Sequence, residues 1–578
     1  MKRTGLAETP VTPLRARLRF QTSSLLLVYF ATFCALLYLY WPALHGHFVF
    51  DDRSLPFFKD MRDSPISSWI SGVRPALMAS YWLNYHLWGL APFSYHLLNV
   101  VVHFFNTGLV FLVLFRLLGL AGWARSRAGM AAVIGAVIFA IHPLQTESVS
   151  YVAGRSESLA SFFMLLSYAI FLYRREPSIS WAEAVLVLLV FGAAVTTKEN
   201  AVSLAGVLVL TDVFWPVPFS WRGMRQNWRL YALMLPGVIA AGVAVARVLA
   251  TSETAGFSVV TFKWYQYGFT EARVLFSYIG MALFPVGQSI DHDYPPSHTL
   301  LEHGAIFYVL LLGALVAISV RYRRRFPLSC FGLLMFLIFL APTSSIIPLD
   351  DAFVERRMYL ALLGLLLIAC DWASRLRVRR AVAGGLLVFI GLAYCKLCRD
   401  RNQLWGQPDR LVEMAAASAF YNPRPLLNFT EILIAEGRCD LAPGYLQRAE
   451  QRLPNNYYVN AAWGRTLACL GRLDLGMQRL QVAARIHPCS EIYEWMGLLY
   501  GQMGLLEQAG EVLRKAVELD PDSETAHGSL ALWFENMRNL AAAEREYRTA
   551  MSLDRTDYWA KAGFNRVRAM EAGGVSRP

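Results

Sequence analysis

Charge is scarce in this sequence. Asp, Glu, Lys and Arg make up only 17% of the 578 residues, whereas hydrophobic residues make up 56%. So little charge, together with a mean hydropathy of +0.37, excludes a wholly soluble chain and is typical of a polytopic membrane protein that carries a soluble part.

Cysteine is sparse as well. The eight cysteines are too few and too scattered for a disulfide framework. Cys395 and Cys398 have the spacing of a redox pair, but without a thioredoxin-like context we expect a structural role. A single disulfide between neighbouring repeats remains open, and the sequence does not choose among Cys439, Cys469 and Cys489.

A continuous basic surface is also missing. The formal net charge is +12, which in another context would favour a nucleic-acid partner. Here the basic residues lie between apolar segments, so they indicate the cytoplasmic ends of membrane spans, and we expect no nucleic-acid binding.

What the sequence has in abundance is apolar segments, and these predict about eleven transmembrane helices. The first follows a basic start and is expected to be a retained anchor rather than a cleaved signal. The predicted spans are 25–41, 96–118, 130–141, 159–173, 182–195, 202–214, 231–250, 306–320, 328–341, 358–374 and 380–395.

A twelfth apolar segment, 272–286, is expected to be re-entrant or to lie on the membrane surface. Gly280 and Pro285 disfavour a regular span. A true span here would also place the arginines at 321–325 on the outer side, against the positive-inside pattern. With eleven spans, the C-terminal part and the loops 42–95 and 251–303 lie on the non-cytosolic side.

The chain after the last span is soluble and repetitive. Pro454, Pro488 and Pro521 recur at intervals of 34 and 33 residues, and Gly437, Gly471 and Gly504 recur at the same intervals. This period is typical of tetratricopeptide helix pairs. We predict a transmembrane domain over 1–398, a linker over 399–423, four repeats over 424–557 and a C-terminal cap over 558–578.

Two adjacent carboxylates, Asp51 and Asp52, lie about ten residues after the first apolar segment and precede Arg53. Carboxylates so close to a membrane are costly unless a cation or a substrate uses them. The simpler alternative is a solvated turn. Acids and arginines gathered at outer span ends suit one reaction, in which a carboxylate takes a hydroxyl proton and cations hold a departing phosphate.

Several motifs carry a resemblance to a known family. They are Phe48-Val-Phe-Asp51-Asp52, Arg74-Pro75, Pro92-Phe-Ser-Tyr-His96-Leu-Leu-Asn99, His142-Pro-Leu-Gln-Thr-Glu147, Gly154-Arg155-Ser-Glu157, Lys198-Glu199, Glu355-Arg356-Arg357 and Arg401-Asn402-x-x-Trp405. In this order, and followed by repeats, they resemble the transmembrane and tetratricopeptide-repeat O-mannosyltransferases. The resemblance implies an all-α C-type glycosyltransferase fold, a polyprenyl-phosphate sugar as donor and a protein hydroxyl as acceptor.

By that resemblance the acidic pair holds the catalytic base, and of the two we favour Asp52 because Arg53 follows it. For the donor phosphate the candidates are Arg273, Arg356, Arg357, Lys198 and Arg155. For the acceptor or the sugar they are Glu157, Glu147, His142, Asp291, Asp293 and Glu355.

Each of these assignments has a structural alternative. Glu157 and Arg155 could form a buried pair that fixes a turn, Lys198 could be neutralised by a local acid, and Arg356 could extend from a helix end. Asp291, His292 and Asp293 have the chemistry of metal ligands. Because adjacent residues rarely converge on one ion, we expect no obligatory metal and no cofactor.

The sequence thus predicts an inverting, multi-pass membrane glycosyltransferase whose repeats bind the protein acceptor. A bacterial inner membrane with periplasmic repeats, or an endoplasmic reticulum membrane with luminal repeats, would fit. Two alternatives remain: a transferase acting on a glycan or lipid, with the repeats as an assembly scaffold, and a non-enzymatic transporter or scaffold. Transport is disfavoured because charge lies at span ends rather than at the midplane.

Overall fold

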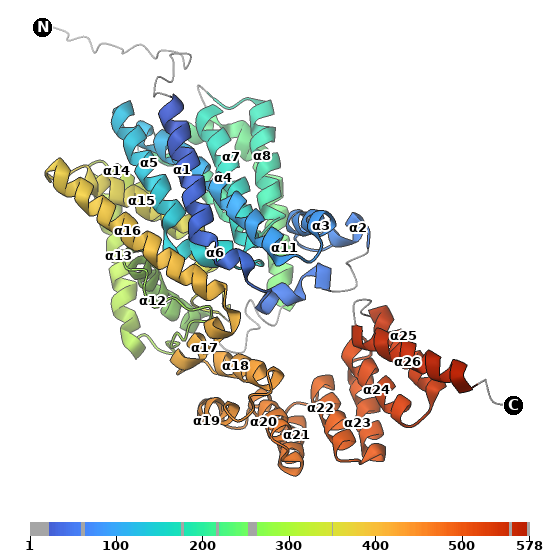
Figure 1. Ribbon diagram of the computed structural model, residues 1–578. Helices are drawn as coiled ribbons and strands as arrows, with labels where there is room; N and C mark the ends of the chain where they lie inside the picture. The colour runs from blue at the N-terminus through green and yellow to red at the C-terminus, as the bar shows by residue number, and fades with distance from the viewer. Residues whose placement is uncertain are drawn as a thin grey trace, which may run out of the picture.

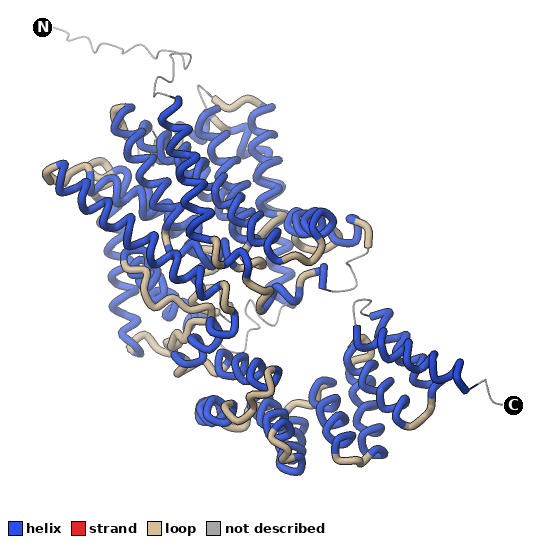
Figure 2. Tube along the Cα trace, in the orientation of Figure 1, coloured by secondary structure: helices blue, strands red, loops and turns tan. Residues whose placement is uncertain are grey.

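The computed structural model describes residues 22–58, 64–174, 178–215, 219–251, 263–349, 351–553 and 558–574, and within these ranges the chain forms helices and loops without a β-strand (Figure 2). Figure 1 shows a bundle of long helices, from α1 (Thr22–Tyr40) to α16 (Arg380–Trp405). Below it lies an arc of paired helices from α18 (Arg424–Ala435) to α26 (Tyr558–Gly574). The basic residues before position 22 and Arg555 lie outside the described ranges.

Every apolar segment predicted to span the membrane coincides with a helix. Besides α1 and α16 these are α4 (Pro92–Leu120), α5 (Arg125–Ile141), α7 (Arg155–Arg174), α8 (Trp181–Val195), α9 (Ser203–Phe214), α11 (Trp228–Thr251), α13 (Ala305–Arg321), α14 (Pro327–Leu340) and α15 (Met358–Ala373). The prediction of helix at these positions is confirmed.

Membrane crossing is supported for fewer of them. In the described residues, four helices are long and apolar enough to span a bilayer: Pro92–Leu120, Arg155–Tyr173, Glu302–Arg321 and Arg380–Trp405. A fifth results if α5 and Pro143–Ser150, which meet at 54°, count as one broken span. The segment 272–286 mostly belongs to one regular helix, α12 (Trp264–Leu283), which is not among the four.

Close helix contacts in the bundle depend on small and polar residues. Helices α14 and α15 approach each other at Gly332 and Gly364, where neither position has room for a Cβ atom. Helix α4 is joined to α15 by Tyr359, whose hydroxyl lies 2.7 Å from Nδ1 of His103 and 2.9 Å from Nδ2 of Asn106. Both contacts are typical of helices that pack in an apolar surrounding.

The connecting loops that carry the predicted site gather at the end of the bundle opposite the start of α1, which we call the outer end (Figure 1). The short elements there are η2 (Phe50–Ser54), α2 (Ile66–Trp69), α3 (Pro75–Trp88), α6 (Thr146–Ser150), η8 (Glu355–Arg357) and α17 (Pro408–Ser418). The helix pairs begin directly after α17, so they are attached to the outer end of the bundle.

The expected repeats correspond to four helix pairs. They are α18 with α19 (Ala442–Arg452), α20 (Tyr457–Cys469) with α21 (Leu473–Ile486), α22 (Ser490–Gln502) with α23 (Leu506–Leu519), and α24 (Glu524–Asn536) with α25 (Leu540–Leu553). Gly437, Gly471 and Gly504 take positive φ angles of 72°, 74° and 76° at the turns. Only glycine adopts this conformation without cost. In the last pair Arg538, also at positive φ, takes that place.

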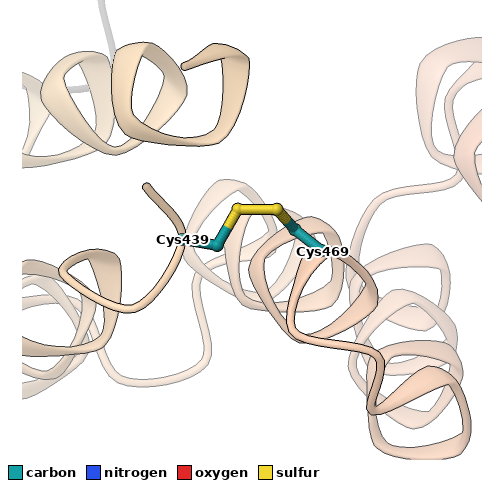
Figure 3. The surroundings of a disulfide bond; sticks show 2 residues. All are labelled: Cys439 and Cys469. Carbon is teal, nitrogen blue, oxygen red and sulfur yellow. A yellow bond between two sulfur atoms is a disulfide. The ribbon is translucent and has the colours of Figure 1, made fainter. Parts of the chain in front are cut away.

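One disulfide joins the first two pairs. Cys439, in the turn after α18, is bonded to Cys469, the last residue of α20, and their Cα atoms are 6.1 Å apart (Figure 3). Cys489 is free, as are Cys395 and Cys398. The structure therefore selects one pair among the three open cysteines.

Breaking this disulfide should lower the stability of the repeats. Closing a loop with a sequence separation of 30 residues is worth about 3–4 kcal/mol. We expect the double variant Cys439→Ser/Cys469→Ser to unfold at a temperature several degrees lower in a circular dichroism melt, whereas Cys489→Ser, the matched control, melts like the parent protein. Equal melts for all three would show that the bond contributes nothing.

Candidate functional site

The acidic pair of the first loop has two different environments. Asp52 is completely buried, and its carboxylate accepts main-chain N–H groups from Val49 at 3.0 Å and from Ala153 at 2.7 Å. Asp51 is exposed, and its own N–H donates to the Tyr151 hydroxyl at 2.9 Å. Asp52 therefore joins the first loop to the connection between α6 and α7, while the side chain of Asp51 is exposed beside the Tyr151 hydroxyl.

Burial raises the pKa of Asp52 to about 7 from an ordinary value of 3.8. The two main-chain N–H groups and the positive charge of Arg155 act in the opposite direction, and the neighbouring Asp51 raises the pKa further. The side chain of Arg53, on which our preference for Asp52 rested, lies outside the described residues.

Tyr151 connects the acidic pair to the end of α16. Its ring is stacked on Trp405, with centroids 5.7 Å apart. Ser150, the residue before it, donates a hydrogen bond to Asn402 of the same helix. The first loop, α6 and the end of α16 thus form one packed unit.

Glu147 and Arg356 form the next layer of the site. Glu147 is buried, and it accepts the Arg356 main-chain N–H at 2.9 Å and the Arg356 guanidinium Nη1 at 2.6 Å. The Arg356 side chain is still 27% exposed. Only part of its guanidinium is engaged by Glu147, so the remainder is available to an anion.

Glu355, the neighbour of Arg356, faces a different segment. Its buried carboxylate accepts Gln288 Nε2 at 2.6 Å and the Ser289 N–H at 2.8 Å, and it lies 2.7 Å from His292 Nε2. Burial opposes ionisation, but the hydrogen bond from His292 and the charge of Arg401 hold the pKa of Glu355 below its ordinary value. Glu355 thus has a structural role in joining these segments, and its contact with acceptor or sugar stays a prediction.

Arg401 is the site residue that sequence reasoning missed. It is 5% exposed, and among the described residues its Nε and Nη2 atoms have no hydrogen-bond partner; the same is true of Trp405 Nε1, one turn further along α16. Buried donors are nearly always paired, so three unpaired ones together indicate a missing acceptor. The motif containing both residues was visible in the sequence, but nothing in it distinguished Arg401 from other arginines.

Arg155 is enclosed by protein acceptors. It is fully buried; Nε donates to Asn99 at 2.8 Å, Nη2 donates to Asn84 at 2.8 Å, and the guanidinium lies over the ring of Tyr81. These contacts assign it to the support of α3 and α4. The pair with Glu157, one of the two alternatives for these residues, does not form.

Glu157 instead pairs with Lys198, through a direct contact between Nζ and Oε2. Both side chains are largely buried, at 8% and 14% exposure. Glu199 pairs with Arg74 rather than with its neighbour Lys198. Lys198 is neutralised as the structural alternative expected, but by an acid 41 residues away.

Three further candidates are held by main-chain carbonyls. Arg273 donates to the Pro295 carbonyl and the Ser297 hydroxyl, both at 2.8 Å. Arg357 donates to the carbonyls of Ala352 and Asp351. His142 is buried, and its Nε2 lies 3.0 Å from the Ala282 carbonyl. These contacts stabilise the loops around the site. They use much of the hydrogen-bonding capacity that the three side chains could offer to a ligand.

Asp291 and Asp293 face the helix pairs instead of the site. Asp291 accepts two hydrogen bonds from Arg424, and Asp293 accepts the main-chain N–H groups that follow α17. Their contact with acceptor or sugar stays a prediction. No group of three or more His, Cys, Asp or Glu side chains suited to a metal occurs in the part of the chain that is described.

The elevated pKa of Asp52 predicts how stability responds to pH. Because the folded protein holds this proton up to about pH 7 and the unfolded chain only to about pH 4, this group contributes stability below pH 4 that is lost as the pH rises to 7. In Asp52→Asn the melting temperature should therefore change less between pH 4 and pH 7, while Asp51→Asn should keep the pH dependence of the parent. Apparent melting temperatures between pH 4 and pH 8 measure this; an unchanged slope in Asp52→Asn would refute it.

Comparison with known proteins identifies similar chains. Protein O-mannosyl-transferase TMTC3 of Mus musculus is 26% identical over 595 residues, which cover 90% of this chain and 63% of the mouse protein. Protein O-mannosyl-transferase Tmtc1 of Drosophila melanogaster is 33% identical over 201 residues, covering 31% of this chain and 22% of the fly protein. This chain therefore spans less than two thirds of the length of these relatives.

The repeats have matches of their own. The Tetratricopeptide repeat family matches residues 490–523, which contain α22 and α23. A thermophilic TPR protein of Thermus thermophilus aligns with 31% of this chain, and with 96% of its own length, at a TM-score of 0.27 and 19% identity. Together with the similarity over 90% of the chain, the repeat match confirms the resemblance carried by the motifs.

Proposed function

We propose that this chain transfers a mannose-like sugar from a polyprenyl-phosphate donor to Ser or Thr hydroxyls of a protein. The observation that carries the proposal is the group of unpaired donors on Arg401 and Trp405, together with the partly exposed guanidinium of Arg356. The name of the relatives, protein O-mannosyl-transferase, supports the choice of sugar and acceptor.

The phosphate of the donor is proposed to lie between Arg356 and Arg401. Guanidinium groups match phosphate oxygens in two parallel hydrogen bonds, and they keep their charge when buried. Burial of Arg401 strengthens its interaction with an anion because water does not compete. Arg273, Arg357, Lys198 and Arg155 take no part in this proposal, since protein acceptors engage them.

Asp51 is proposed as the general base. It is exposed, whereas Asp52 is buried and accepts two main-chain N–H groups. In the reaction, Asp51 takes the proton of the acceptor hydroxyl, whose oxygen attacks the anomeric carbon from the face opposite the phosphate. The bond from that carbon to the phosphate oxygen breaks, and its electron pair leaves with the polyprenyl phosphate. Asp52 positions the loop and Asp51 acts on the substrate.

We infer that the outer end, the candidate site and the repeats lie on the non-cytosolic side, as the span pattern of the sequence predicts. The disulfide between Cys439 and Cys469 supports this side for the repeats, because disulfides persist in oxidising compartments and are rare in the cytosol. A lipid-linked donor at the bilayer surface would then meet protein acceptors held by the repeats.

Replacing the base should stop transfer without preventing donor binding. Loss of a general base lowers rates by roughly 10²–10⁴-fold, so we expect Asp51→Asn in detergent or nanodiscs to lose nearly all transfer of labelled mannose from polyprenyl-phosphate mannose to a Ser/Thr peptide. Asp400→Asn, an exposed acid on α16, is the control and keeps the parent rate. Full activity of Asp51→Asn would remove Asp51 from the reaction.

Neutralising the unpaired guanidinium should weaken donor binding. Hydrogen bonds to charged groups contribute about 1.5–3 kcal/mol, so Arg401→Gln should bind polyprenyl-phosphate mannose roughly ten- to a hundredfold more weakly in a titration. Lys396→Gln removes a charge from the exposed side of the same helix and should bind like the parent. An unchanged affinity in Arg401→Gln would contradict the phosphate site.

A further inference from the structure

The segment between α12 and α13 separates the candidate site from the repeats. On one side it meets Glu355, through Gln288, Ser289 and His292. On the other side it meets the start of the repeat region, through Asp291 and Asp293. This one stretch of the chain contacts both parts of the molecule.

Asp293 holds the linker between α17 and α18. Its carboxylate accepts the main-chain N–H groups of three consecutive residues: Phe420, Tyr421 at 2.7 Å and Asn422 at 2.6 Å. A carboxylate that accepts several N–H groups from one turn fixes the direction in which the chain enters the following helix. Helix α18, the first of the repeats, begins two residues later.

Arg424, the first residue of α18, adds a second connection. Its Nε and Nη2 atoms both donate to Asp291 at 2.7 Å, and Nη2 also donates to Asp351 at 2.6 Å. Asp351 lies four residues before Glu355. One guanidinium on the repeats therefore holds both loop segments that converge on Glu355, while about half of it, 48%, remains exposed.

The three consecutive side chains of this segment divide between two neighbours. Asp291 and Asp293 face the repeats, and His292 between them faces Glu355 and packs on Phe353, with ring centroids 4.4 Å apart. This alternation also explains why the three residues do not converge on one ion.

We propose that Arg424, Asp291, Asp293 and Asp351 form a docking joint that holds the repeats in a fixed orientation over the candidate site. The joint positions an acceptor bound on the repeats so that its hydroxyl reaches Asp51. Its four members act through geometry and do not touch the reacting atoms. This inference rests on the proposed function and adds to it a defined set of positioning residues.

The joint predicts a difference between long and short acceptors. Loss of positioning costs about tenfold or more in rate. In the full chain in nanodiscs, Arg424→Gln should therefore lower kcat/KM about tenfold for a long unfolded Ser/Thr-rich polypeptide. A short Ser/Thr peptide, which reaches the site without the repeats, should react at the parent rate. Arg424→Lys keeps one charged contact and should restore part of the loss.

Arg438→Gln is the matched control, because Arg438 pairs with the nearby Glu436 on the surface of the repeats. This substitution should leave kcat/KM unchanged for both the long and the short acceptor. Equal losses for both acceptors in Arg424→Gln would assign the joint to folding alone, and no loss for either would remove its positioning role.

Hydrogen exchange tests the joint independently of catalysis. In the parent, the amides of residues 420–422 should exchange slowly because Asp293 accepts them, and in Asp293→Asn or Arg424→Gln they should exchange faster, while Arg438→Gln exchanges like the parent. Unchanged exchange in both variants would contradict the joint. If the parent transfers sugar to neither acceptor, the proposed function fails, and the exchange result still decides on the joint.

Discussion

Buried carboxylates organise the outer end of this protein. A carboxyl group removed from water must form hydrogen bonds or meet a cationic partner, otherwise it opposes folding. Asp52, Glu147 and Glu355 all satisfy this requirement with donors from another loop. Each acid thereby connects segments that are far apart in the sequence. Together the three acids hold the loops at the outer end, next to α5, α15 and α16.

The unpaired donors of Arg401 and Trp405 differ from these paired acids. Arg155, Arg273 and Arg357 donate to acceptors of the chain, whereas Nε and Nη2 of Arg401 have no hydrogen-bond partner among the described residues, although the charge of Arg401 acts on Glu355. An anionic substrate would supply the missing acceptors, and the exposed Asp51, beside the Tyr151 hydroxyl, would provide the base. The inference of function therefore comes from the contrast between satisfied and unsatisfied groups.

The sequence predicted the local features well, because they follow from short-range patterns. Apolar length predicted the helices, and the period of 33–34 residues with glycine at each turn predicted the four pairs. In the last pair, Arg538 stands at positive φ where the other turns have glycine, and no pattern in the sequence indicated this. These properties depend on residues within one helix or one turn.

Partnerships across the fold could not be predicted in the same way. Lys198 is neutralised by Glu157 and not by Glu199, and Asp291 and Asp293 bind residues more than 120 positions away. Which arginine stays unpaired depends on the positions of all acceptors around it, and that information is available only after folding. Most residues of the site could be named from the sequence, but their contacts and roles could not.

The most direct test of the account is an intact-mass comparison of non-cytosolic proteins from cells with the parent chain, without it, and with the Asp51→Asn variant. The account predicts hexose-mass additions on Ser or Thr residues of some of these proteins, present only with the parent chain. The same additions in all three cell lines, or additions confined to glycans or lipids, would contradict it.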